Sequence, residues 1–154
     1  MEIIFKPIGY AYTNFSDEEV KEKGKDIEYR IEILKEYEEG LDKIDGFSHL
    51  IVIFYFHKLR EDQLNVLKVK PKRYRKFNNE LPLIGVFSCD SPSRPNPIGL
   101  SVVEFIKREG RNLYVKGLEA FNGTPILDIK PYTPDRSINK EEIKVPDWYK
   151  NLIK

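Results

Sequence analysis

Cysteine occurs once in this 154-residue chain, and long apolar runs are absent. A single cysteine excludes an internal disulfide framework and any zinc site built from clustered cysteines. The longest apolar run, residues 50–56, is far shorter than the ~20 residues of a membrane-spanning helix. No basic stretch leading into a long apolar segment follows Met1. We therefore expect no signal peptide, no membrane association and a cytoplasmic location.

An excess of one charge is also missing, because the net charge is only +1. Whole-molecule charge thus does not point to a nucleic acid, although a local patch could. The chain has no G-x-x-x-x-G-K-[ST] loop, no G-x-G-x-x-G after a strand and no G-x-S-x-G elbow. ATP-dependent chemistry, dinucleotide cofactors and serine hydrolysis are therefore disfavoured.

Aromatic residues, by contrast, are plentiful, with nine Tyr and nine Phe, and they favour β structure. Residues 27–33 alternate apolar and charged side chains, which predicts a strand with one wet face. Residues 47–57 form an unbroken β-rich run, which predicts a central strand buried on both faces. Further strands are expected at 3–12, 83–88, 100–107, 113–118 and 126–130, and a short helix at 35–43, while 14–26 is either a loop or a short exposed helix. A closed sheet removes exposed edges, so we predict one mainly β, barrel-like domain over 1–154 with short helical decorations.

Few side chains are obvious candidates for catalysis or metal binding. His49 and His57 share a face of the predicted central strand, but eight residues of strand separate them by about 26 Å. Shared metal coordination is excluded at that distance, and we predict no metal site. His49 is typical of a buried histidine at a strand entrance, whereas His57 ends the strand, where side chains reach a pocket. Cys89 is either a nucleophile or, more commonly for a free cysteine, a small buried residue.

Residues 68–76 carry six cations in nine positions, with Tyr74 among them. A solvated loop is the ordinary interpretation. Lys and Arg beside an aromatic ring also suit contact with RNA phosphates and an unpaired base. The candidate contacts are Lys70, Lys72, Arg73 and Arg75.

Residues 91–101 contain a rigid, proline-rich loop. Pro92, Pro95 and Pro97 fix three backbone φ angles and remove three amide donors. Such a loop holds Arg94 without an ordering cost on binding, and Asn96 permits a tight turn. We expect Arg94 and Asn96 to contact substrate; the alternative is a structural crossover that the prolines only stiffen.

The octapeptide Arg94-Pro-Asn-Pro-Ile-Gly-Leu-Ser101 resembles the signature of the TrmO family, also called the YaeB or TsaA-like family. Other blocks resemble the family in the same order. They are Pro7-Ile-Gly-Tyr10, Gly46-Phe-Ser-His-Leu50, Phe56-His57 and Gly123-Thr-Pro-Ile-Leu-Asp-Ile-Lys-Pro-Tyr132. The resemblance covers about residues 3–134 and leaves 135–154 as a charged C-terminal tail.

This resemblance implies a β-barrel methyltransferase that uses S-adenosylmethionine and works as a homodimer. Its implied substrate is N6-threonylcarbamoyladenosine beside the tRNA anticodon, methylated on N6, so tRNA is the implied partner. The resemblance also implies cofactor contacts at His57, Lys58, Asp90, Leu100, Glu119, Ala120, Phe121 and Asn122.

Three departures from the family pattern fall on these positions or near them. Asp90 stands where the family has arginine, Glu119 and Asn122 replace two aspartates, and residues 18–30 lack a Pro-Arg-Gln segment. Arginine to aspartate reverses a charge and removes a bidentate donor. We therefore expect weaker cofactor binding than in a relative with arginine, and Asp90→Arg to strengthen it by about tenfold or more.

Two functions remain open at this point. The first is methyl transfer, which depends mostly on positioning; Asp128 or Tyr132 could accept the proton, or both could be structural. The second is a non-catalytic or re-purposed barrel that binds RNA or a small metabolite. The edited cofactor positions favour the second function, and the intact 94–101 and 123–132 blocks favour the first.

Overall fold

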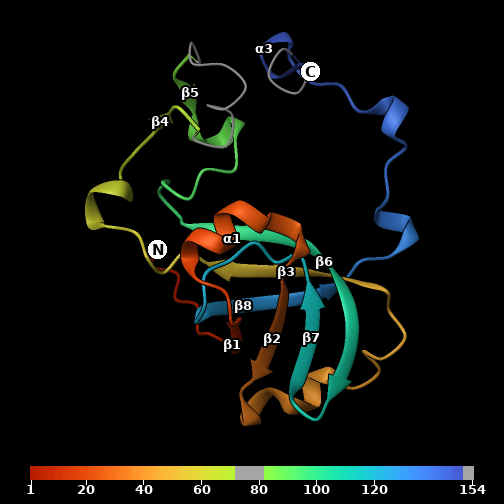
Figure 1. The fold of residues 1–154 in the computed structure, drawn as a ribbon. Helices are drawn as coiled ribbons and strands as arrows, with labels where there is room; N and C mark the ends of the chain where they lie inside the picture. The colour runs from red at the N-terminus through yellow and green to blue at the C-terminus, as the bar shows by residue number, and fades with distance from the viewer. Residues whose placement is uncertain (72–81, 151–154) are drawn as a thin grey trace. The chain divides into compact units, whose positions relative to one another are not determined.

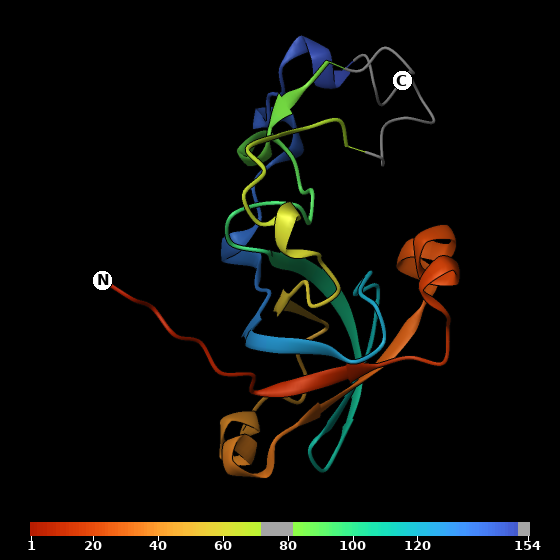
Figure 2. The same ribbon diagram turned by 90° about the vertical axis from the view of Figure 1, so that its left-hand side faces the viewer.

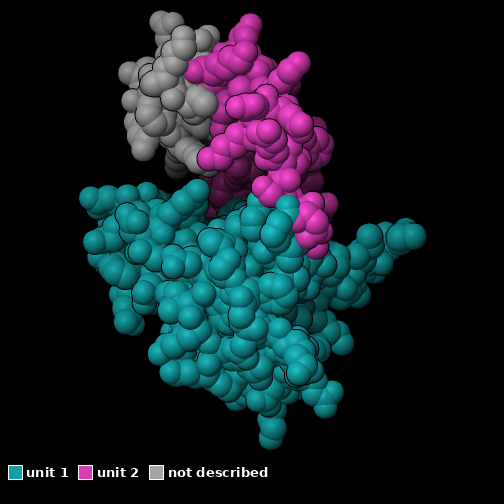
Figure 3. All heavy atoms as spheres, turned by 90° about the vertical axis from the view of Figure 1, so that its right-hand side faces the viewer, with its two compact units in different colours: residues 1–58, 98–134 teal, residues 59–97, 135–154 magenta. Residues whose placement is uncertain are grey.

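A computed structural model describes residues 1–71 and 82–150, which fall into two compact units. Unit 1 comprises residues 1–58 and 98–134, and unit 2 comprises residues 59–97 and 135–154 (Figure 3). The expected single domain over 1–154 stays a prediction. No helix among the described residues combines the length and apolar character needed to cross a bilayer.

Unit 1 is a closed barrel in which every neighbouring pair of strands is antiparallel (Figures 1 and 2). The strand order around the barrel is β1-β2-β7-β6-β3-β8. The strands are β1 (Gly9–Tyr12), β2 (Glu28–Ile33), β3 (His49–Tyr55), β6 (Ile98–Glu109), β7 (Asn112–Lys116) and β8 (Thr124–Pro131). The mainly β, barrel-like fold expected from the sequence is confirmed.

The barrel core consists of the inward-facing residues of these strands. On β2 the alternation is regular, since Tyr29, Ile31 and Ile33 are buried while the residues between them reach solvent. Successive strand residues point to opposite faces, so one apolar row per strand is enough to fill the interior. The remaining apolar side chains of the strands that are at most 5% exposed are Ala11, Leu50, Val52, Phe54, Val103, Leu113, Val115 and Ile126.

Two details of the expected strands are wrong. The opening strand begins at Gly9 instead of residue 3, because Pro7 has no amide to donate and the partner strand β2 ends at Ile33, opposite Gly9. Strand β3 is central, between β6 and β8, but only one of its faces is fully buried. Its other face lies outside the barrel, where Tyr55 is 39% exposed.

The expected hairpin around residues 110–112 is confirmed. Strands β6 and β7 pair as far as Glu109 and Asn112, so that only Gly110 and Arg111 lie in the turn. Gly110 has a φ of 60°, a conformation that glycine adopts without steric cost.

The helices of unit 1 are short. Helix α1 (Asp17–Lys23) begins with a capping box in which Ser16 and Glu19 exchange hydrogen bonds. It continues into a 3₁₀ helix at Gly24–Asp26, and a second 3₁₀ helix covers Lys35–Leu41. The helix expected at 35–43 is confirmed, and of the two alternatives for 14–26 the short helix is the one observed.

Unit 2 holds a two-stranded sheet of β4 (Lys68–Val69) and β5 (Ile84–Gly85). The strand expected at 83–88 is therefore cut to two residues, and a 3₁₀ helix follows it at Val86–Ser88. Other short elements are 3₁₀ helices at Glu61–Gln63 and Lys140–Glu142 and helix α3 (Asp147–Lys150); a 3₁₀ helix at Pro134–Arg136 begins where unit 1 ends.

Candidate functional site

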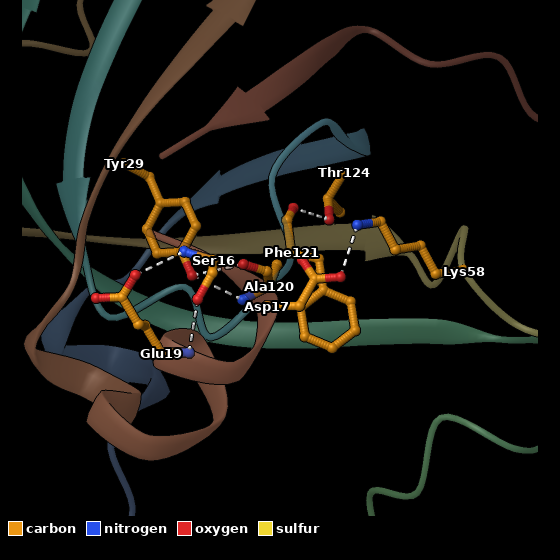
Figure 4. Close-up of polar contacts among 8 residues, drawn as sticks. All are labelled: Ser16, Asp17, Glu19, Tyr29, Lys58, Ala120, Phe121 and Thr124. Atoms are coloured by element: carbon orange, nitrogen blue, oxygen red, sulfur yellow. Dashed lines mark hydrogen bonds and ion pairs between the residues drawn. The ribbon is translucent and has the colours of Figure 1, made fainter. Parts of the chain in front are cut away.

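The candidate site is centred on the loop of residues 119–122, which connects to β8 and is anchored from inside the barrel. Tyr29 of β2 is 1% exposed, and its hydroxyl donates to the Ala120 carbonyl at 2.6 Å and accepts from the Ala120 amide at 3.1 Å (Figure 4). Burial raises the pKa of Tyr29 to about 12, so this hydroxyl stays protonated at neutral pH.

Three more contacts fix the rest of the loop. The hydroxyl of Thr124, itself 2% exposed, donates to the Phe121 carbonyl at 2.6 Å (Figure 4). The Asn122 side chain accepts from the Thr13 amide at 2.9 Å, and the Gly123 amide donates to the backbone carbonyl of Ala11 at 2.8 Å. The loop is therefore held at each residue that follows Glu119.

Glu119 has an unusual backbone conformation, with a φ of 57°. A non-glycine residue in this left-handed region costs roughly 1–2 kcal/mol, and such strain gathers at functional sites. The Glu119 side chain is exposed, so the strained position presents a carboxylate to solvent.

Lys58 and Lys21 lie over the ring of Phe121, and Lys58 also pairs with Asp17. The Lys58 ammonium lies 2.7 Å from the Asp17 carboxylate and 5.4 Å from the Phe121 ring centre (Figure 4). The Lys21 ammonium lies 5.5 Å from the same centre. An aromatic ring can stack on a planar heterocycle, and ammonium groups can bind a carboxylate.

His57 follows β3 and precedes Lys58. Its pKa is lowered by burial and by the charge of Lys58, against an opposing effect of Asp17. His57 is therefore neutral at pH 7. His49 is exposed at the other end of β3, with its Nδ1 2.7 Å from the Ser48 hydroxyl, so the expectation of a buried histidine there is wrong.

The proline-rich loop of unit 2 uses Arg94 to hold itself together. Nη1 of Arg94 donates to the carbonyls of Cys89 and Ser91, both at 3.0 Å. These two residues flank Asp90, whose side chain is exposed, as is that of Asn96. The stiffness expected of this loop thus has a second source besides its prolines. Cys89 is half-buried, and its sulfur lies 3.9 Å from the Gly85 carbonyl oxygen and 3.8 Å from that of Val86.

Leu100 lies on the outer face of β6, where it is 64% exposed and pairs with Ile53 of β3. Neighbouring positions on the same face are also apolar. We call this set the outer apolar row; it consists of Ile51, Ile53 and Tyr55 of β3 and Ile98, Leu100 and Val102 of β6.

The structure brings some of the expected site residues together. Lys58, which adjoins His57, meets Phe121 of the 119–122 loop. Ala120 is 5% exposed and contributes through its backbone. Asp90, Arg94 and Asn96 belong to unit 2. Lys70 is an exposed residue of unit 2, while Lys72, Arg73 and Arg75 lie outside the described residues.

The two candidate proton acceptors lie apart from this loop. The Tyr132 amide donates to the His49 carbonyl, at the far end of β3 from Lys58 and about 20 Å away along a strand of this length. Asp128 pairs with Lys130 at 2.9 Å and lines a cleft beside the Lys35–Leu41 helix. No group of three or more His, Cys, Asp or Glu residues within 1–71 and 82–150 could hold a metal ion.

Sequence reasoning did not identify Asp17, Lys21 or Tyr29 as part of the site. Tyr29 carried a usable signal, because it is the one hydroxyl-bearing residue in the inward row of a strand that is otherwise isoleucine. Asp17 and Lys21 carried none, since charged residues on a short helix are ordinary.

Comparison with known proteins identifies the family. A family model described as the tRNA-methyltransferase O N-terminal domain matches residues 19–137. The chain belongs to the TrmO family. One TrmO crystal structure superposes with a TM-score of 0.71 at 29% identity, covering 94% of this chain and 64% of that one.

Several curated relatives extend this result. A probable S-adenosyl-L-methionine-binding protein of Pyrococcus abyssi is 35% identical over 99% of this chain and 79% of its own length. An S-adenosyl-L-methionine-binding protein of Archaeoglobus fulgidus is 38% identical over 86% of this chain and 91% of its own. The human tRNA (adenine(37)-N6)-methyltransferase is 34% identical over 84% of this chain. This TrmO chain spans only 30% of that human enzyme, and less than two thirds of the solved TrmO chain.

Proposed function

We propose that this protein is an S-adenosylmethionine-dependent methyltransferase that modifies adenine N6 in tRNA. The observation that carries the proposal is the anchored 119–122 loop, which presents Phe121 beside Lys58 and an exposed Glu119 carboxylate in a chain of the TrmO family. The names of the archaeal and human relatives supply the cofactor and the reaction.

The charges and the ring at this site fit the cofactor. S-adenosylmethionine carries a carboxylate, an ammonium, a sulfonium, a ribose diol and an adenine. Lys58 supplies a cation for the carboxylate, Glu119 an anion for the ammonium or the diol, and Phe121 a ring for the adenine or the sulfonium. Three of the five features of the cofactor thus have a partner of suitable chemistry on elements of unit 1.

The reaction then depends on positioning. When bound, the cofactor supplies an electrophilic methyl group on its sulfonium. The residues of this chain hold that group in line with the acceptor nitrogen, and fixed geometry of this kind accounts for much of the rate of such a transfer. His57, neutral at pH 7, adds no positive charge beside a cationic sulfonium.

Calorimetric titration with S-adenosylmethionine tests the cofactor assignment. We expect saturable binding that weakens by about tenfold in Phe121→Ala and in Lys58→Ala, since each removes a direct contact. Lys107→Ala is the matched control, because Lys107 lies on the outer wall and pairs with Glu109. Wild-type protein without any binding would contradict the proposal.

Transfer of a labelled methyl group to tRNA separates the enzyme from a binding module. We expect label in tRNA and its loss when adenine 37 is replaced. Cofactor binding with no transfer to any tRNA would instead favour the re-purposed barrel, which the change at Asp90 supports.

We also propose that the protein is a cytoplasmic homodimer. The support is the outer apolar row, in which Leu100 is 64% and Val102 45% exposed, since a second copy would remove this surface from water. Light scattering should give about twice the chain mass of 18.1 kDa, and Val102→Glu should lower it. A wild-type mass near that of one chain at high concentration would contradict the dimer.

A further inference from the structure

The hydroxyl of Tyr29 is a polar group in an otherwise apolar wall. Tyr29 is 1% exposed, and Ile27 and Ile31, two residues before and after it, are fully buried. Phenylalanine would fill the same space, so packing alone does not call for the hydroxyl. A buried hydroxyl without a partner destabilises the fold, and this one has both its partners on a single residue, Ala120.

Ala120 lies between the two residues that the proposed function assigns to the cofactor. Glu119 on one side holds a φ of 57°, and Phe121 on the other has the Lys21 and Lys58 ammonium groups at 5.5 and 5.4 Å from its ring centre. A chain free to relax would leave the left-handed region at Glu119. The two hydrogen bonds to Ala120 fix both peptide groups of that residue and so oppose the relaxation.

Thr124 acts on the same segment from its other end. Its buried hydroxyl donates to the Phe121 carbonyl, so the peptide groups on either side of the Phe121 ring are both fixed (Figure 4). The two hydroxyls come from different strands, β2 and β8, which the closed barrel holds in place.

We propose that Tyr29, assisted by Thr124, is a positioning residue for cofactor binding. Its hydroxyl holds Ala120 so that the Glu119 carboxylate and the Phe121 ring stand ready for the cofactor before it arrives. The role rests on the proposed function, because it requires that the 119–122 loop binds S-adenosylmethionine. Tyr29 itself touches no reacting atom. Preorganisation of this kind removes an ordering cost from the binding free energy.

The test is S-adenosylmethionine affinity in Tyr29→Phe, measured by calorimetry well below the unfolding temperature. We expect the dissociation constant to rise by about tenfold, the effect of leaving one buried polar group without its partner. Amide exchange at Ala120 should become faster, because its amide loses the Tyr29 oxygen. Thr124→Val should weaken binding in the same way and serves as the second variant if Tyr29→Phe does not fold.

Ile31→Val is the control for a merely structural effect. Ile31 is fully buried two residues along the same strand, and its shortening destabilises the barrel without touching the loop. We expect it to lower the unfolding temperature while the affinity and the Ala120 exchange stay as in wild type. Unchanged affinity in folded Tyr29→Phe overturns the positioning role. A wild-type protein that binds no S-adenosylmethionine overturns the proposed function first, and this role with it.

Discussion

His57 is a residue whose protonation depends on two charged neighbours of opposite effect. Burial and Lys58 lower its pKa, and Asp17 raises it. Lys58 and Asp17 form an ion pair at 2.7 Å, so removing either one also releases the other. Replacing Lys58 and replacing Asp17 with neutral residues must therefore shift the His57 pKa in opposite directions.

We predict that Lys58→Gln raises the pKa of His57 and that Asp17→Asn lowers it further. The first change removes a positive charge and leaves Asp17 without its partner; the second does the reverse. A proton NMR titration of the histidine resonances measures both, and the His57→Gln spectrum assigns the signal. Shifts of the same sign in the two variants would contradict the assignment of these charges.

The lowered pKa of His57 also determines how the stability of the folded protein changes with pH. Folded His57 binds a proton less readily than the unfolded chain, whose histidine titrates at about 6.5. The folded state therefore loses stability as the pH falls below about 6.5, and this contribution is constant above it. The loss should be smaller in His57→Gln.

At the scale of elements, β1 depends on a close approach of two backbones. A Cβ atom at Gly9 would lie 2.3 Å from the carbonyl oxygen of Glu32 on β2, and the clash involves backbone that cannot rotate away. β1 also has only four residues, with β2 on one side and β8 on the other. Any shift of β1 therefore opens the barrel on two sides.

Gly9→Ala should accordingly destabilise the protein by about 1–3 kcal/mol, the usual cost of overpacking. Gly40→Ala is the matched control, since nothing lies within 4 Å of the added Cβ in the Lys35–Leu41 helix. That change should be neutral or stabilise by about 0.4–1 kcal/mol. Urea unfolding, monitored by circular dichroism, measures the free energy of unfolding of both variants. Equal unfolding midpoints for the two variants would show that β1 can shift to make room for the added Cβ.

The elements are predictable from the sequence where local chemistry determines them. The alternation in 28–33 and the Gly110 turn are enough to identify β2 and the β6–β7 hairpin. The start of β1 is not predictable, because it depends on where its partner β2 ends. The candidate site likewise contains residues that the sequence indicates and residues that only the fold brings in. Motif resemblance points to His57, Lys58 and the 119–122 loop as candidates, whereas Asp17 joins Lys58 through a contact 41 residues along the chain.

At the scale of the whole molecule, the near-zero net charge conceals two units of opposite sign. Unit 1 carries 13 Lys and Arg against 17 Asp and Glu, whereas unit 2 carries 13 against 8. A polyanion such as tRNA is therefore attracted to unit 2 and repelled by much of unit 1. The proposed tRNA contacts at Lys70, Lys72, Arg73 and Arg75 all belong to the basic unit.

Replacing these four residues with alanine should weaken tRNA binding and reduce its salt dependence. The slope of log affinity against log salt should fall by about 0.7–0.9 for each phosphate that the variant no longer neutralises. A control that replaces Lys6, Lys25, Lys35 and Lys130, four exposed residues of unit 1, removes the same charge and should leave the slope nearly unchanged. Equal slopes of log affinity against log salt in the two variants would indicate that residues 68–76 form a solvated loop without phosphate contacts.

The segment 59–97 leaves the barrel after β3 and returns at β6, two strands that pair directly with Tyr55 opposite Ile98. In topological terms it is a long loop of the β3–β6 hairpin. The hydrogen bonds between β3 and β6 already hold its two ends together. Such an insertion can lengthen, shorten or be exchanged between relatives while the ladder keeps its register, because loop closure costs little more as a loop grows. The proposed tRNA contacts therefore lie on a segment whose length can change without disturbing the strands that carry the loop proposed to bind the methyl donor.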